Sequence, residues 1–294
     1  MTSRVVGAMQ AGVARGRGKH YGGLRSLREH VLRRAYLGDW PARAWGLLPH
    51  ARTVRLLHHE LMVGSDAPLR VAFASDLHLG PTTSIHTLEH AFAHLRRCRP
   101  DVLVLGGDYV FLDATEARMD ALAELVGSVD AKVKLAVFGN HDLWTDHERI
   151  ERALKSARTQ VLVNQAVRLP APWSHVAILG LDEPWTGAPD AARAIKACGD
   201  ATVRLAVSHA PYAWNHLREH DVALLWCGHT HGGQIALPGA RGARPIVLPP
   251  YCENLAYGMH RFPEGHVFVS RGIGATELPV RTFAPPDVAL FTLT

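Results

Sequence analysis

The stretch GHTHGGQ, at residues 228–234, places two histidines one residue apart directly after the apolar run VALLWC. In an extended chain the side chains of residues i and i+2 point to the same side, so His229 and His231 can converge on one small object. Imidazole nitrogens are borderline ligands that suit Zn²⁺ and Fe. Two histidines beside glycines are poor choices for a turn, so the pair favours a metal site.

Four further polar blocks each follow an apolar run. They contain the following candidate ligands: Asp76, His78, Asp108, Asn140 and His209. Because α/β sheets bind their ligands at the carboxyl ends of strands, all five blocks are predicted to meet in one place. Asp, Asn and His offer oxygen and nitrogen donors without a thiolate, a set that suits Mn²⁺, Fe and Zn²⁺. Seven such residues match two ions that share a carboxylate, the arrangement that clamps a phosphoryl centre.

Taken one at a time, the blocks have plainer explanations. An Asp-x-His pair after a strand commonly serves as a capping and hydrogen-bonding pair, and Asn-His-Asp also forms turns well. The ordered series of five blocks is what favours a metal centre over these alternatives. Cys227, just before Gly228, is expected to be a buried thiol at the end of its strand rather than a ligand.

The blocks SDLHLG, GGDYV, GNHD and GHTHGGQ, together with SRGIGATELPVR at residues 270–281, resemble the calcineurin-like metallophosphoesterase superfamily. Within it they are most similar to bacterial phosphodiesterases and UDP-2,3-diacylglucosamine pyrophosphatases. The resemblance runs from about Leu69 to Thr294. It implies an α/β fold of four layers, in which two mixed β-sheets pack together and helices flank them.

The resemblance also implies a role for each residue of the site. One divalent ion would be held by Asp76, His78 and His231, and the other by Asn140, His209 and His229, with Asp108 as the bridge. Mn²⁺ is the first candidate for both positions, with Zn²⁺ or Fe as alternatives. His141 would be the general acid that protonates the departing oxygen. Arg271 and Arg281 could grip a phosphate bidentately or form structural salt bridges.

One position departs from the pattern of the superfamily's phosphoprotein phosphatases. Many of these read G-D-x-x-D, whereas the fifth position here is Phe111. The carboxylate that would orient His141 is therefore replaced. Either Asp142, Asp113 or a solvent network serves instead, or the acid is weaker. This departure disfavours a protein serine/threonine phosphatase.

Strands and helices alternate along the part of the chain that carries these blocks. Short apolar runs predict strands at 69–75, 101–107, 133–139, 176–181, 203–209 and 222–227, and periodicity predicts helices near 84–98 and 114–127. Near-continuous apolar strands indicate sheets buried on both faces. The last third of the chain, with PIVL, HVFVS and VALFTL between Gly and Pro turns, is expected to be richer in strands.

The composition is that of an ordinary globular protein. Of the 294 residues, 47% are apolar and 20% are charged, which excludes disordered, collagen-like and disulfide-scaffold classes. Four scattered cysteines lack a C-x-x-C spacing, which argues against a zinc finger and favours reduced thiols. No apolar run reaches the length of about 18 residues that a spanning helix needs, and no secretory h-region is visible. These features predict a cytoplasmic protein.

Charge is concentrated in the first 60 residues, which carry 11 Lys and Arg against 3 Asp and Glu. We therefore expect two parts: a basic segment, 1–60, and the catalytic domain, 61–294. The first 23 residues are predicted to be a mobile arm. A helix from Leu24 follows, with Leu27 and Val31 on its apolar side. This helix suits an anionic membrane surface on the inner face, although it could equally pack on the catalytic domain.

The combined features predict a phosphohydrolase acting on phosphodiester or pyrophosphate bonds. A membrane-presented substrate such as UDP-2,3-diacylglucosamine of lipid A synthesis fits the basic N-terminal helix. The first alternative is a soluble phosphodiesterase for small nucleotides or wall polymers. The second is a nucleic-acid-binding module that uses the Arg-rich arm, but the chain lacks the interleaved aromatic and basic residues of single-strand binders. No specific nucleic acid and no protein partner are predicted.

Overall fold

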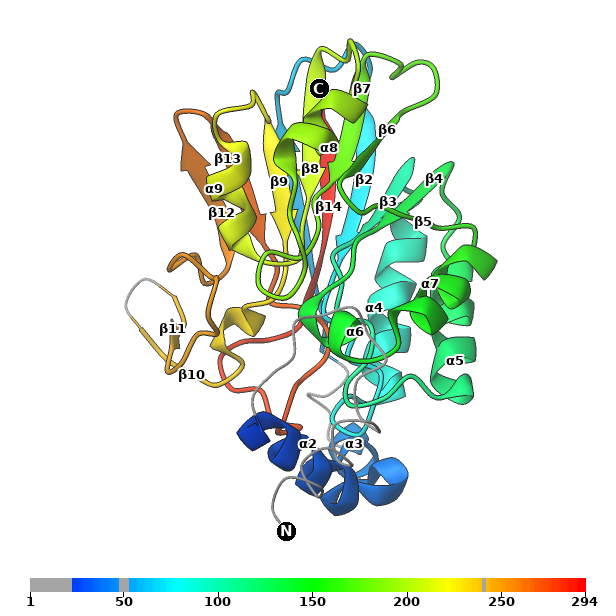
Figure 1. Cartoon of the computed structure of the whole chain (residues 1–294), viewed down its shortest axis with the longest axis vertical. Helices are drawn as coiled ribbons and strands as arrows, with labels where there is room; N and C mark the ends of the chain where they lie inside the picture. The colour runs from blue at the N-terminus through cyan, green and yellow to red at the C-terminus, as the bar shows by residue number, and fades with distance from the viewer. Residues whose placement is uncertain (1–22, 48–52, 240–241) are drawn as a thin grey trace.

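The computed structural model describes residues 23–47, 53–239 and 242–294. All but the last residue of the predicted arm lies outside this part of the chain. The described residues form two six-stranded sheets that face each other, with helices on both outer sides (Figure 1). This is the predicted four-layer α/β arrangement, and the prediction is confirmed.

The first sheet has the order β1-β14-β2-β3-β4-β5. Its strands are β1 (Arg55–Leu61), β14 (Asp287–Leu293), β2 (Leu69–Ala74), β3 (Val102–Leu105), β4 (Val133–Ala136) and β5 (Gln160–Val161). Strands β2 to β5 are parallel, whereas β14 runs antiparallel to β2 and parallel to β1. Each predicted strand of this sheet ends earlier than expected, because the residues after it leave the ladder to form the site.

The second sheet has the order β12-β13-β9-β8-β7-β6. Its strands are β12 (Gly258–Phe262), β13 (Gly265–Val269), β9 (Leu224–Cys227), β8 (Val203–Val207), β7 (Val176–Gly180) and β6 (Gln165–Arg168). The four central strands are parallel, and the two edge strands are antiparallel to their neighbours. A small hairpin of β10 (Ala236–Leu237) and β11 (Arg244–Pro245) projects beside this sheet.

Helices cover the outer faces of both sheets. The first sheet is covered by α4 (Ile85–Cys98), α5 (Glu116–Gly127) and α7 (His147–Ser156), and the second by α8 (Ala191–Ala197) and α9 (Trp214–Leu217). Successive strand residues face opposite sides. Ala72 and Ala74 of β2 accordingly pack toward the helices, while Val71 and Phe73 pack toward the second sheet.

The layer between the sheets is apolar and rich in aromatic rings. The Phe291 ring of β14 lies 5.1 Å from the ring of Phe268 and 5.6 Å from that of Trp226, measured between centroids. Phe73 contacts Phe268 edge-on at 6.0 Å. Because all four side chains are fully buried, this aromatic cluster joins strands of both sheets into one core.

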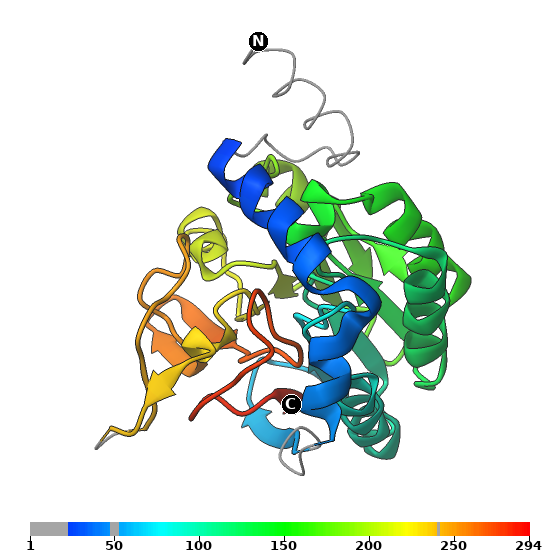
Figure 2. The same cartoon turned by 90° about the horizontal axis from the view of Figure 1, so that it is seen from below.

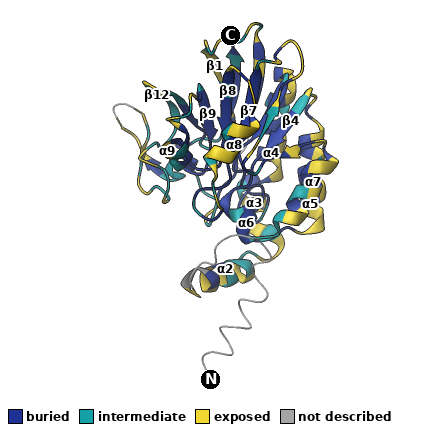
Figure 3. Ribbon diagram, turned by 45° about the horizontal axis from the view of Figure 1, so that its top comes forward, coloured by how far each residue is buried: buried dark blue, intermediate teal, exposed yellow. Residues whose placement is uncertain are grey.

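The N-terminal helices pack against the end of the domain that lies opposite the C-terminus (Figure 1). They are α2 (Gly23–Ala35), the 3-10 turn η1 (Leu37–Asp39) and α3 (Trp40–Gly46). The predicted helix is present, but its polar side faces the protein: Glu29 is buried, while Leu27 and Val31 are 50% and 55% exposed (Figure 3). The predicted boundary at residue 60 falls inside β1, which pairs with β14 along its full length.

Replacement of Phe291 by Ala should lower the free energy of unfolding by about 3–5 kcal/mol, because it removes a fully buried ring from the core between the sheets. Phe283→Ala is the matched control, since the Phe283 ring is 60% exposed. Its effect should stay within about 0.5 kcal/mol. Urea unfolding of both variants measures the difference, and equal losses would contradict the role of the aromatic cluster.

Candidate metal centre

The five predicted blocks meet at the carboxyl ends of five strands. Asp76 and His78 follow β2, and Asp108 follows β3. Asn140 opens the short helix α6 (Asn140–Trp144) after β4. His209 follows β8 of the second sheet, and the GHTH block follows β9 and leads into the 3-10 turn η4 (His231–Gly233). The site therefore lies where the two sheets adjoin, and each sheet contributes residues.

The side chains of these blocks approach closely enough to share an ion. Two groups have ligand atoms that lie within 4.8 Å of one another: Asp76, His78 and His231 in one, and Asp76, Asp108 and His209 in the other. All of these residues are buried. The Nε2 atoms of His78 and His231 are 3.1 Å apart. This spacing leaves room for small cations and not for a large organic group.

Asp108 occupies the middle of the arrangement. Its Oδ2 atom lies 3.5 Å from Nε2 of His78 and 3.2 Å from Nε2 of His209. Asp76 is also shared, since its Oδ1 atom is 3.5 Å from Nε2 of His231 and 4.0 Å from Nε2 of His209. Two carboxylates, and not one, therefore stand between the two groups of histidines.

Hydrogen bonds fix the tautomers of two histidines. Nδ1 of His209 lies 2.8 Å from the carbonyl oxygen of Gly106, and Nε2 of His229 lies 2.7 Å from that of Pro250. Because a carbonyl only accepts, each of these nitrogens carries the proton. The other nitrogens, Nε2 of His209 and Nδ1 of His229, face each other at 3.3 Å. These two nitrogens are placed to share a cation when one replaces the proton beside Asp108.

A buried amide oxygen supports the same interpretation. Oδ1 of Asn140 has no hydrogen-bond partner in the described part of the chain, although the residue is only 2% exposed. Buried polar atoms without a partner are rare in native proteins, and an ion is one of the few explanations for them. Amide oxygen is also a ligand type that divalent cations accept. The donor set therefore fits the predicted metals.

The electrostatics of the site favour a positive charge beside the Asp108 carboxylate, while the imidazoles of His78 and His229 stay neutral. Burial lowers the pKa of His78 to about 4 and that of His229 to about 3, so both rings are neutral near pH 7. Burial also lowers the pKa of His209, but the carboxylates of Asp108, Asp76 and Glu183 together outweigh burial and raise that pKa to about 10. A positive charge is therefore favoured beside Asp108, and a divalent cation supplies it as well as a proton does.

The backbone of the site is held in an uncommon conformation. Asp76, His78, Asp108, His229 and His231 all have φ between 45° and 71°, and each such non-glycine residue costs on the order of 1 kcal/mol or more. Glycines make the close approach possible: a Cβ atom on Gly228 would overlap the Asp76 carboxylate, and one on Gly139 would overlap that of Asp108. Five of the seven candidate ligands therefore carry this backbone strain.

The Asp of the GNHD block connects the loops of the site. Both Asp142 oxygens accept from backbone N–H groups, those of Asp108, Tyr109 and Gly139, each at 2.8 Å. These bonds tie the loop after β3 to the start of α6. Asp113 ion-pairs with Arg118 and with Arg33. The two carboxylates that were candidates for orienting His141 therefore bind other groups.

Aromatic rings surround His141 instead. Its ring centroid lies 5.0 Å from that of His78, 5.5 Å from that of Phe111 and 5.3 Å from that of Trp144. Its backbone N–H donates to Oδ1 of Asp108 over 2.8 Å. Phe111, the residue that departs from the G-D-x-x-D pattern, thus packs on the predicted general acid.

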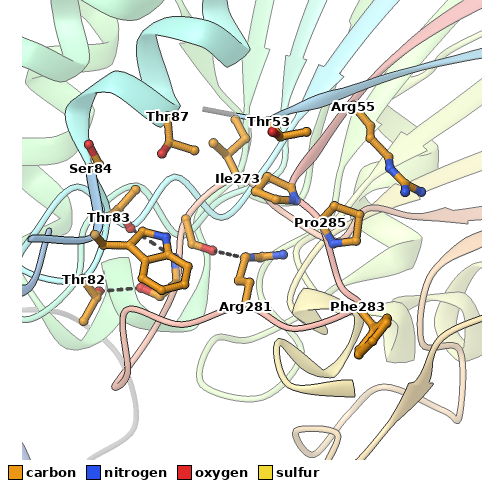
Figure 4. Close-up of a pocket in the computed structure, with 14 residues that line it drawn as sticks. Thr53, Arg55, Thr82, Thr83, Ser84, Thr87, Ile273, Arg281, Phe283 and Pro285 are labelled. Carbon is orange, nitrogen blue, oxygen red and sulfur yellow. Dashed lines mark hydrogen bonds between the residues drawn. The ribbon is translucent and has the colours of Figure 1, made fainter. Parts of the chain in front are cut away.

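The two predicted phosphate-gripping arginines direct their donors to the protein itself. Arg271 pairs with Asp287 at 3.1 Å, which is the salt-bridge alternative. Beside a neighbouring cavity of about 280 Å³, Arg281 donates to the carbonyl oxygens of Gly274 and Ala284 (Figure 4). Its Nη2 atom reaches Nδ1 of His231 at 3.0 Å. Arg281 therefore positions a histidine of the site and does not point into the pocket above it.

A pocket of about 640 Å³ opens over the candidate ligands. Asp108, Asn140, His141, His229 and His231 line its polar part. Its other walls are formed by Ile235, Ile246, Val247, Leu248, Pro249, Pro250 and Leu278, and by Trp185, Arg28 and Glu277. Sequence reasoning missed all of these. The run PIVLPP contains no polar side chain, so nothing within it marks it as part of a site.

The site holds buried carboxylates among imidazoles and opens to a pocket at the ends of parallel strands. These are the features of a metal-dependent enzyme. Residues 69–233 match the family model of the calcineurin-like phosphoesterases, and the chain belongs to this family. It is a metal-dependent phosphoesterase. The resemblance that the sequence motifs indicated is confirmed at this level.

Two bacterial relatives are similar over most of their length. The chain is 31% identical to "Phosphodiesterase YaeI" of Escherichia coli, over 81% of this chain and 87% of that one. It is also 31% identical to "Uncharacterized metallophosphoesterase YkuE" of Bacillus subtilis, over 74% and 77%. Among solved structures, the protein TT1561 of Thermus thermophilus is 12% identical, with a TM-score of 0.48 over 70% of this chain and 91% of that one.

Replacement of Asp108 by Asn should weaken both metal positions together, by about tenfold or more each, because its carboxylate lies between the two groups. His231→Ala should mainly deplete one position. Metal content is measured by mass spectrometry after loading with Mn²⁺ or Zn²⁺. His90→Ala, an exposed histidine on α4, is the control and should keep the wild-type content. Fewer than two ions per wild-type chain at saturation would contradict this arrangement.

Proposed function

We propose that the chain is a binuclear, divalent-metal-dependent phosphohydrolase that cleaves phosphodiester or pyrophosphate bonds. The observation that carries the proposal is the pair of facing ring nitrogens of His209 and His229 beside the central carboxylate of Asp108. The sequence identity of 31% to a protein named phosphodiesterase supports phosphodiesters over phosphomonoesters as substrates. Mn²⁺ is the favoured metal, because the donors are oxygen and nitrogen without thiolate.

The proposed ligands are those implied by the motifs. Asp76, His78 and His231 would hold one ion, Asn140, His209 and His229 the other, and Asp108 would bridge them. The proximity of Asp76 to both groups supports a shared role for this carboxylate as well. Two such ions, when bound, provide a nucleophilic water near neutral pH and stabilise negative charge on the phosphoryl oxygens.

His141 is proposed as the general acid. It lines the pocket beside Asp108 and Asn140, and its ring lies between those of His78, Phe111 and Trp144. Contacts with three rings, edge-on with His78 and Trp144 and tilted with Phe111, can contribute to the orientation of an imidazole that other members of the superfamily orient with a carboxylate. In this position the ring can deliver a proton to the oxygen that leaves phosphorus.

Replacement of His141 by Ala should keep both metals and lower turnover by about 10²- to 10⁴-fold for a diester with a poor leaving group. For bis-p-nitrophenyl phosphate the loss should be much smaller, because p-nitrophenolate departs without protonation. The comparison of kcat for an alkyl and a p-nitrophenyl ester measures this, with metal content as control. Equal losses for both esters would remove His141 from the acid role.

The pocket and the surface around it support a membrane-presented, amphiphilic substrate, of the kind of UDP-2,3-diacylglucosamine. The exposed large apolar side chains of the described surface are Leu27, Val31, Leu37, Trp40, Leu47, Met62, Ile85, Leu237, Ile246, Val247, Leu278 and Phe283. All but Met62 belong to the N-terminal segment 27–47, the start of α4, the strand β10 or the loops that contain residues 246–247 and 278–283. Met62 follows β1. The last residue of this strand pairs with β14 close to the C-terminus, at the opposite end of the molecule (Figure 1).

An apolar rim of this kind suits the surface of a bilayer. Exposed Arg43 and Arg244 lie beside it, and each basic side chain near an anionic leaflet contributes about 1 kcal/mol. No helix among the described residues is both long and apolar enough to cross a membrane. We therefore propose reversible attachment to an anionic membrane face, with the soluble phosphodiesterase as the alternative that the next experiment tests.

Replacement of both Leu37 and Leu47 by Ser should weaken co-sedimentation with phosphatidylglycerol vesicles at low salt by about tenfold, because both side chains are largely exposed on the rim. Met62→Ser is the matched control, since that side chain is 89% exposed away from the rim. Neither change touches the pocket, so turnover of a soluble diester reports intact folding. A full chain that ignores these vesicles would support the soluble alternative.

A further inference from the structure

The pocket over the candidate metal centre contains an arginine from the N-terminal helix. Among the described residues that line it, Arg28 of α2 is the only Lys or Arg. Its guanidinium faces the Glu277 carboxylate as a fork: Nη2 lies 2.8 Å from Oε1, and Nη1 lies 3.2 Å from Oε2. Seen from below, α2 crosses the lower end of the molecule beside the segment that carries Glu277 (Figure 2).

Several contacts fix the backbones that carry this pair. The Tyr36 hydroxyl donates to the carbonyl oxygen of Glu277 over 2.6 Å, and Arg33 of the same helix donates to the carbonyl oxygen of Leu112. On the other side, Nε2 of Gln234 donates to the carbonyl oxygens of residues 276 and 278, at 3.0 and 2.9 Å. Arg28 therefore reaches the pocket from an N-terminal segment that is hydrogen-bonded to the loops containing Leu112 and Glu277.

The pair itself contributes little to the fold. Both side chains are close to half exposed, at 48% for Arg28 and 44% for Glu277, and such pairs are worth at most about 1 kcal/mol. A planar guanidinium fork binds phosphoryl oxygens with the same bidentate geometry that it uses for a carboxylate. An incoming phosphoryl group can therefore replace Glu277 at low cost.

We propose that Arg28 binds a second phosphoryl group of the substrate, separate from the one that reacts. Glu277 is the partner of Arg28 when no substrate is bound. This inference rests on the proposed phosphohydrolase function and narrows it: the substrate is a compound with two linked phosphoryl groups, such as a nucleoside diphosphate derivative. The N-terminal helix then supplies a specificity residue to the active site in addition to its place on the apolar rim.

The test compares UDP with UMP, which differ by one phosphoryl group, as ligands of the full, metal-loaded chain. Their affinities are measured by calorimetry and as inhibition constants against bis-p-nitrophenyl phosphate. The wild type should prefer UDP, and Arg28→Ala should reduce the ratio of the two affinities by about 10- to 100-fold, the effect of one charge-assisted bidentate contact. Arg28→Lys should fall between, because it keeps the charge without the fork.

Glu277→Gln distinguishes a binding role from a structural one. If Glu277 competes with the substrate for Arg28, its neutralisation should tighten UDP binding several-fold and leave the affinity for UMP unchanged. Arg34→Ala, an exposed arginine on the same helix that does not line the pocket, is the control and should keep the wild-type ratio.

Three results would overturn the inference: a wild type without preference for UDP, an equal loss of UDP and UMP affinity in Arg28→Ala, or weaker UDP binding in Glu277→Gln. Calorimetry needs no turnover, so the role of Arg28 is measured even if the diester is not cleaved. Absence of metal-dependent cleavage by the wild type would count against the proposed function instead.

Discussion

Two buried carboxylates, Asp76 and Asp108, are the constraint on which the rest of the structure depends. Removing an ionised carboxylate from water is costly unless donors or a cation compensate it. The fold supplies donors first: the His229 N–H lies 3.0 and 3.1 Å from the two oxygens of Asp76, and the His141 N–H reaches Asp108. The imidazoles of His78 and His229 stay neutral, so the charge that balances these carboxylates has to come from a cation beside Asp108, either a proton on His209 or a divalent ion.

The positions of these groups follow from the way the two sheets end. Parallel strands deliver their carboxyl ends to one edge, and here the edges of both sheets adjoin. The loops that leave them are short and strained, and they are held by backbone hydrogen bonds such as those to Asp142. Phe111, at the fifth position of the G-D-x-x-D pattern, packs its ring beside His141, with 5.5 Å between the ring centroids.

The pocket above this centre is chemically uneven, and the unevenness supports the proposed substrate class. Its base holds the candidate ligands, one wall is an apolar run around Val247, and a single guanidinium among the described lining residues, that of Arg28, enters from α2. A substrate with a phosphoryl core and an apolar part matches each of these surfaces. The exposed apolar rim continues the apolar wall outward, so the same face that would meet a bilayer also admits the substrate.

The sequence by itself determined the strands β2, β3, β4, β7, β8, β9, β13 and β14, the helices α4 and α5 and the ordered blocks of ligands, because apolar periodicity and polar residues after a strand are local properties. Only the tertiary structure decided which way α2 faces: Glu29 is buried and Leu27 exposed. The contacts of the helix with the domain include the ion pair of Arg28 with Glu277 and the hydrogen bond from Arg33 to the carbonyl oxygen of Leu112. The tertiary structure also turned Arg281 toward His231 and brought Arg28 into the pocket. These outcomes depend on contacts between residues up to 249 positions apart, which no local pattern encodes.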